Sequence, residues 1–214
     1  MATRGSQPFV QTSFTDQPGI GYAGYIESYQ DRVVNNRITQ FWTPDELLCG
    51  TGVVKGQVQN FDNADSSIRQ PYTVITPSFD STDPLTEDDF VGVVFRREFG
   101  VFPVEGTDGN FTGYRARRVV PIVPKNLGVG VFVDQRPTIG DVTSGDPVYM
   151  VTTILARFTS GNLDYNLLPG QFVNVAAQTD GHTILIPNAY WKYTRNGGGS
   201  SNRFLDPINT IIFA

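Results

Sequence analysis

Residues 90–95 are FVGVVF, a near-continuous apolar run interrupted by a single glycine. Because successive side chains of a strand point to opposite faces, such a run indicates a strand buried on both faces. Other short segments, rich in branched residues and bounded by Gly or Pro, recur along the chain and predict further strands. These segments are residues 37–43, 51–60, 72–76, 98–104, 111–117, 119–123, 129–133, 147–154, 171–176, 183–186, 189–194 and 208–213.

The composition favours the same class of fold. Val, Ile and Thr total 57 of the 214 residues, and the 22 Gly and 14 Pro are spread along the chain as turn formers. Branched side chains suit a pleated strand and lose rotamer freedom in a helix. The one helix candidate is residues 44–48, with Thr43 as N-cap and Pro44 at the first helical position. We therefore expect an all-β fold, a jelly-roll-like sandwich or barrel with an extended N-terminal arm.

The N-terminal stretch differs from the rest of the chain. Residues 1–35 lack a strong period, but aromatic residues interrupt their polar sequence. A pure linker is rich in Gly and Ser and has few aromatics. We predict an arm over residues 1–35 that docks on its own body or on a neighbour, and a β-sandwich or barrel domain over residues 36–214. The arm residues expected at an interface are Phe9, Phe14, Tyr22 and Tyr25.

Charge and the counts of reactive residues argue against several classes of protein. The 16 Lys and Arg against 21 Asp and Glu give a net charge of −5, which argues against a nucleic-acid partner. No apolar run has the length of a membrane span, and no basic segment precedes an apolar stretch at the start, so we expect no membrane partner and no standard secretion signal. A single cysteine, Cys49, and a single histidine, His182, exclude an intrachain disulfide and a Cys/His zinc site.

The ionisable residues show no catalytic pattern. We interpret His182 as a turn residue, since Asp180 is too close in sequence to complete a triad, and Cys49 as a buried structural thiol. The acidic segment 80–89 is expected to be a solvated loop, with a site for a hard cation such as Ca²⁺ as the alternative. We therefore predict no catalytic residues, no cofactor and no metal. A hydrolase with paired carboxylates ranks last among the hypotheses.

One short segment concentrates positive charge. Arg115, Arg117 and Arg118 fall within four residues, and Arg96 and Arg97 would lie beside them if the neighbouring strands pair. Arginine's planar, forked donors suit carboxylates at an interface. The alternative is that these are exposed strand ends that keep the protein soluble. We predict Arg115, Arg117 and Arg118 as interface residues.

Several turn and strand motifs follow one another in a recognisable order. In residues 137–150, PTIGDVTSGDPVYM, Gly145 and Asp146 reverse the chain and Pro147 opens a strand where no N–H is needed. The accompanying motifs are Gly19–Gly24 (GIGYAG), Phe90–Val93 (FVGV), Ile186–Trp191 (IPNAYW), the glycine bend 197–199 and the last apolar segment 208–214. Together these features resemble the structural cement, or capsid decoration, proteins of tailed phages.

The resemblance implies a function without catalysis. Such a protein sits on the outer face of an icosahedral virion and stabilises it by bridging subunits of the major capsid protein, often paired across a symmetry axis. We accordingly expect the major capsid protein and a second copy of this chain as partners, a homodimer first and a trimer as the alternative. The competing hypothesis is a carbohydrate-binding or adhesin-like β-sandwich that uses exposed aromatics, namely Trp42, Trp191 and Tyr193.

Overall fold

The computed structural model describes residues 23–27, 38–57, 69–96, 102–103, 112–134, 138, 140–159, 162–177, 180–195 and 208–213. These residues form strands and turns, with one 3₁₀ turn, η2 (Glu87–Asp89), and no α-helix among them. The prediction of an all-β protein is confirmed. None of the described residues belongs to a helix long and apolar enough to cross a membrane.

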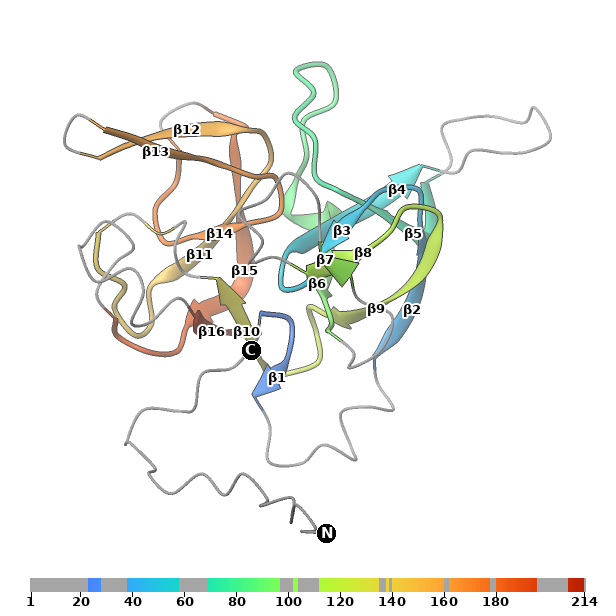
Figure 1. Cartoon of the computed structure of the whole chain (residues 1–214), viewed down its shortest axis with the longest axis horizontal. Coiled ribbons are helices and arrows are strands. Elements are labelled where there is room, and N and C mark those ends of the chain that lie inside the picture. Colours follow the sequence, from blue (N-terminus) through green and yellow to red (C-terminus); the bar gives the residue numbers. More distant parts are fainter. Residues whose placement is uncertain are drawn as a thin grey trace, which may run out of the picture.

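Five strands close into a barrel, seen on the right of Figure 1. They are β2 (Thr39–Thr43), β5 (Arg69–Ile75), β4 (Gly52–Gln57), β6 (Phe90–Val94) and β9 (Arg118–Pro124), in that order around the barrel. β2 pairs antiparallel with β9 and parallel with β5, where Trp42 lies beside Thr73. Because the barrel is closed, its strands have no unpaired edge.

A six-stranded antiparallel sheet, on the left of Figure 1, packs against the barrel. Its order is β1 (Ile26–Glu27), β10 (Gly130–Asp134), β16 (Ile208–Phe213), β15 (Thr183–Trp191), β11 (Pro147–Val151) and β14 (Phe172–Val173). A hairpin of β12 (Leu155–Thr159) and β13 (Asn162–Leu167) stands apart from it. A small sheet joins β3 (Leu47–Leu48), β8 (Thr112–Tyr114) and β7 (Phe102–Pro103).

Strand β6 separates two hydrophobic cores, which confirms the two-sided burial predicted for FVGVVF. Phe90 and Val93 point into a core shared with the six-stranded sheet, where Trp191 is also fully buried. Val94 points the other way, into the barrel interior, and Val91 packs against that interior. Other members of the barrel core are Phe41, Leu47, Cys49, Val53, Val74, Tyr114, Val120 and Ile122. The barrel and the sheet are therefore joined through the two faces of one strand.

The helix predicted over residues 44–48 is wrong. Leu47 and Leu48 instead form β3, which pairs with β8, and Leu47 is buried in the barrel core. The Asp45 carboxylate accepts the backbone N–H of Thr76 at 2.9 Å, a contact with a distant segment. Tertiary packing and this hydrogen bond outweigh the weak helical preference of five residues.

Two strands predicted separately are a single strand, β15, which runs from Thr183 to Trp191 through Pro187. Asn188 has a positive φ of 57°, and the pairing of β11 with β15 shifts register between Pro147 and Tyr149. A bulge of this kind tolerates a proline inside a strand. Proline at this position therefore marks an irregularity in the strand and not its end.

The turn at Gly145-Asp146-Pro147 is confirmed as a structural feature. Gly145 has a φ of +93°, and the Asp146 carboxylate accepts the N–H of Thr143 at 2.7 Å. The turn is tied to β15, since the N–H of Gly145 donates to the carbonyl of Trp191 and the N–H of Trp191 donates to the carbonyl of Asp146. β11 then begins at Pro147.

Candidate functional site

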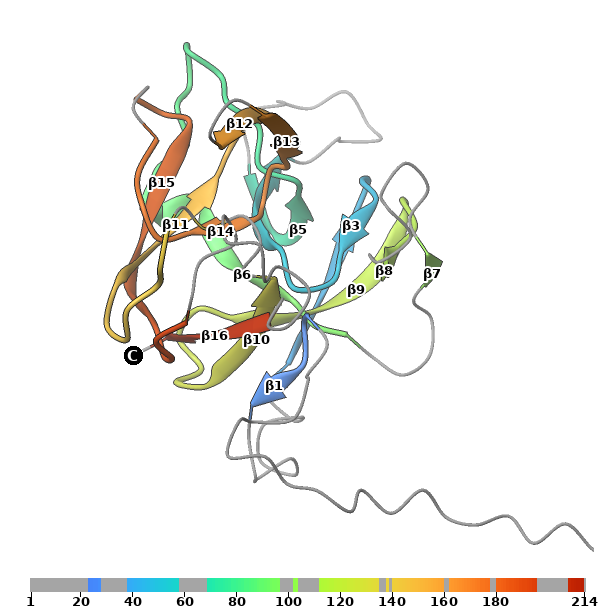
Figure 2. The ribbon, with the colours of Figure 1, turned by 60° about the vertical axis from the view of Figure 1, so that its left-hand side comes forward.

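The interface residues predicted in the arm are described only in part. Phe9, Phe14 and Tyr22 lie outside the described residues. Tyr25 is described, and it lies in a short segment, residues 23–27, that we call the arm root. Figure 2 shows the strand of this segment, β1, beside β10 at the edge of the sheet.

The arm root connects the sheet to the barrel. The N–H of Gly24 donates to the carbonyl of Phe132 at 2.7 Å, and the N–H of Phe132 donates to the carbonyl of Tyr25 at 2.8 Å. On the barrel side, the N–H of Arg96 donates to the carbonyl of Gly24 at 3.0 Å. The Tyr25 ring meets Phe95 edge-on at 6.5 Å, with the Arg96 guanidinium 5.9 Å from its centre. Docking on the protein's own body is thus found for these residues.

Two glycines allow the arm root to pack closely against the barrel strands. Gly24 has a φ of +91°, and a Cβ there would lie 2.8 Å from the carbonyl oxygen of Val94. Gly50 has a φ of +79°, and a Cβ there would lie 2.6 Å from the Cβ of Ala23. Both positions require the left-handed conformation and the missing side chain of glycine.

Glu27, at the end of the arm root, is held by two side chains that follow β15. The Tyr193 hydroxyl donates to Glu27 Oε1, and the Lys192 ammonium lies 3.0 Å from Glu27 Oε2. Burial raises the pKa of the Tyr193 hydroxyl, and its hydrogen bond to Glu27 adds to that. Burial alone would lower the pKa of Lys192, but its contacts with Tyr193 and Glu27 outweigh this, so the pKa is raised. Both groups therefore keep their protons at neutral pH.

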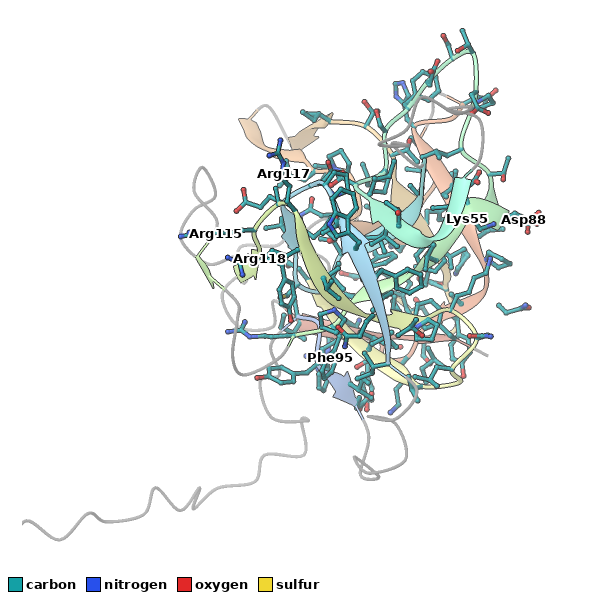
Figure 3. All side chains as sticks on the ribbon, turned by 90° about the vertical axis from the view of Figure 1, so that its right-hand side faces the viewer. Lys55, Asp88, Phe95, Arg115, Arg117 and Arg118 are labelled. Atoms are coloured by element: carbon teal, nitrogen blue, oxygen red, sulfur yellow. The ribbon has the colours of Figure 1, made fainter. Side chains whose placement is uncertain are left out.

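Arg115 and Arg117 lie in the connection from β8 to β9, Arg118 is the first residue of β9, and all three are exposed. Figure 3 shows Arg115, Arg117 and Arg118 on one side of the molecule, with Asp88 and Lys55 on the opposite side. β7 pairs with β8, as predicted for the segments 98–104 and 111–117. β6 pairs with β9, and the Tyr114 hydroxyl donates to the carbonyl of Phe95 at 2.9 Å. Arg97 lies outside the described residues.

An exposed apolar pair lies next to these arginines, and the sequence did not reveal it. Trp42 of β2 lies directly opposite Val119 of β9, and they are 39% and 59% exposed. The residues on either side of Trp42 in β2, Phe41 and Thr43, are buried in the barrel. The alternation in β2 was visible in the sequence, but the pairing with β9 joins segments too far apart to be inferred.

The aromatic residues of the carbohydrate hypothesis are not equally available. Trp191 has no exposed surface, so the expectation that it is an exposed sugar platform is wrong. Tyr193 is half-buried, and its hydroxyl is taken by Glu27. Trp42 alone of the three is exposed. A sugar site built from these aromatics would therefore have one platform.

Two carboxylates of the acidic segment, those of Asp80 and Asp89, form hydrogen bonds within its own turns. Asp80 Oδ1 accepts the N–H and the hydroxyl of Thr82, contacts that lower the Asp80 pKa. Asp89 Oδ2 accepts the N–H and the hydroxyl of Thr86, which caps η2. Within the part of the chain that the structure describes, no three His, Cys, Asp or Glu side chains gather as a metal site would require.

The single histidine and the single cysteine have structural surroundings. His182 meets the Phe79 ring edge-on at 5.2 Å, and its carbonyl accepts the N–H of Thr152. Cys49 is a free thiol, buried in the barrel core, as predicted. His182 thus holds the segment that leads into the acidic loop against the sheet.

A family model described as Structural cement protein (E217 gp24/Pam3 gp6) matches residues 10–202 of the 214. The chain belongs to this phage structural cement family. The comparison with curated proteins found no match. Membership gives the cement protein a structural role in the virion and an association with capsid proteins.

Proposed function

We propose that this cement protein binds the outer face of an icosahedral capsid, contacts the major capsid protein and bridges neighbouring subunits without catalysing a reaction. The observation that carries the proposal is the family match over residues 10–202. A bridge works by contact area and shape, and it requires no metal or nucleophile.

The rigidity of the body supports this role. β6 contributes to both cores, and the arm root is hydrogen-bonded to the sheet and to the barrel. A preformed surface loses little conformational entropy when it binds, so more of the contact energy appears as affinity. A brace between capsid subunits needs a body of this kind.

We assign the capsid contacts to the arm and to the basic connection. The arm residues are Phe9, Phe14 and Tyr22, with Tyr25 at the root, and the connection contributes Arg115, Arg117 and Arg118. An arm that orders on a neighbour adds contact area at an entropic cost that the new contacts must exceed. We further propose that the protein acts as a homodimer, with a trimer as the alternative, because pairing across a symmetry axis repeats each contact.

Mixing the purified protein with undecorated, expanded capsids tests this function. The protein is expected to sediment with those capsids and to stay in the supernatant with capsids whose sites are already filled. A glycan array probed in parallel is expected to remain blank. Protein left in the supernatant at micromolar concentration, together with glycan binding, would favour the carbohydrate-binding module instead.

A further inference from the structure

We infer that the outer surface of the barrel around Trp42 and Val119, bordered by Arg117 and Arg118, docks into an apolar socket rimmed by carboxylates on the capsid protein. We call these four residues the Trp42 face. The inference rests on the proposed function, and it identifies the surface and the chemistry of its partner.

The register of the barrel places the four residues together. Trp42 lies opposite Val119, and the exposed residues Arg117 and Arg118 immediately precede Val119 in the chain. Side chains directly opposite each other on antiparallel strands have Cβ atoms about 5 Å apart, so the indole and the valine form one apolar surface. The strands are held in place by the closed barrel behind them.

This pair is distinctive among the exposed apolar residues that the structure describes. Leu185 and Tyr190, on the outer face of the sheet, are 44% and 37% exposed, but their cross-strand partners Tyr149 and Ile212 are half-buried. Among the residues that the structure describes, only Trp42 and Val119 are large, apolar, exposed and directly paired with each other. Trp, Tyr and Arg are the residues most enriched at the energetic centres of protein interfaces.

The charge beside the pair selects the partner. In the described part of the chain neither Arg117 nor Arg118 makes an ion pair. Arg117 also has a positive φ of 58°, a backbone state that costs a non-glycine residue free energy and that often marks a functional position. Two uncompensated guanidinium groups on a chain of net charge −5 suit carboxylates across an interface.

A second copy of the chain fits this surface less well. A two-fold contact through the Trp42 face would bring the arginines of one copy near those of the other, and like charges oppose each other. Asp88, in the acidic loop, lies on the side of the molecule away from Arg117 and Arg118 (Figure 3). A copy docking by that loop would make a head-to-tail contact, which gives a ring or a filament and not the two-fold pair of a homodimer.

Titration of capsids with four variants tests the inference. Trp42→Ala is expected to weaken binding by about thirtyfold, and Val119→Glu by at least as much, since it sets a carboxylate against the acidic rim. The double variant Arg117→Gly with Arg118→Ala is expected to bind capsids about tenfold more weakly, with an affinity that depends less on salt. Glycine is chosen at position 117 because it adopts the positive φ without strain. Tyr190→Ala, of matched exposure on the sheet, is expected to change binding less than about threefold.

Three results separate the possible failures. If the wild-type protein does not bind capsids, the proposed function fails and the inference fails with it. If the wild type binds and Trp42→Ala and Val119→Glu bind as tightly, or if Tyr190→Ala is the variant that loses binding, the Trp42 face is overturned and the cement function stands. If these substitutions change the oligomeric state measured by light scattering and leave capsid affinity unchanged, the surface binds a second copy. Thermal melting of each free variant shows whether it is folded. If Trp42→Ala does not fold, Val119→Glu still tests the Trp42 face.

Discussion

Removal of residues 1–27 is expected to lower the free energy of unfolding by about 4 kcal/mol, whereas removal of residues 1–22 is expected to change it little. The two truncations differ only by the arm root. Gly24 and Tyr25 provide three backbone hydrogen bonds that tie the root to Phe132 of β10 and to Arg96 after β6. Each is worth about 1 kcal/mol, and its loss leaves polar groups without partners.

Glu27 adds to the effect of the longer truncation. Its removal leaves the Tyr193 hydroxyl and the Lys192 ammonium without the carboxylate that both contact. The midpoint of thermal unfolding is therefore expected to fall by about 10 °C in the longer truncation, measured by calorimetry on the free protein. Equal melting of the two truncated proteins would contradict the role given to the arm root. A large loss already in the shorter one would place part of residues 1–22 in the body.

Gly92→Ala is expected to lower the free energy of unfolding by about 3 kcal/mol. A Cβ on Gly92 would lie 2.1 Å from the carbonyl oxygen of Val123 and 2.9 Å from the Cα of Pro124. Both are backbone atoms of β9, so the clash is relieved only by moving β6 away from β9. Because that pairing closes the barrel, the strain reaches both cores.

Gly52→Ala on the neighbouring strand is the matched control. Its Cβ would first meet the sulfur of Met150, near the end of a flexible side chain, and then ring atoms of Phe172 and Phe90 at 3.0 and 3.1 Å, all of them side-chain atoms and none of them backbone. The expected loss is therefore smaller than for Gly92→Ala, as measured by denaturant unfolding of both variants. If Gly92→Ala is as stable as the wild-type protein, β6 and β9 do not approach as described.

The sequence predicted the fold best where local chemistry and tertiary structure agree. FVGVVF indicated two-sided burial, and the Gly145-Asp146-Pro147 turn contains its own determinants, a positive φ and a carboxylate cap. The local pattern gave a wrong prediction where a side chain contacts a distant segment. Asp45 is an example, because it accepts a hydrogen bond from Thr76 in a region where the sequence predicted a helix. The β12–β13 hairpin was missed, although Ser160-Gly161 between its strands is a two-residue turn signal.

The surface that we propose to bind the capsid protein could be predicted only in part from the sequence, and the missing part has a physical cause. The arginines were identified because charge density is local, and they are exposed. Trp191 was expected to be exposed but is buried. In β15 even-numbered residues point inward before the bulge at Asn188, as at Ile184 and Ile186, whereas odd-numbered residues point inward after it, as at Ala189 and Trp191. The Trp42–Val119 pair depends on the register between β2 and β9, which lie far apart in sequence.

The most direct test of the central claim is an image reconstruction of capsids decorated with this protein at saturating concentration. We expect density on the outer face that contacts two neighbouring subunits of the major capsid protein. Density that touches one subunit alone, or that lies on the inner face, would contradict the bridging function.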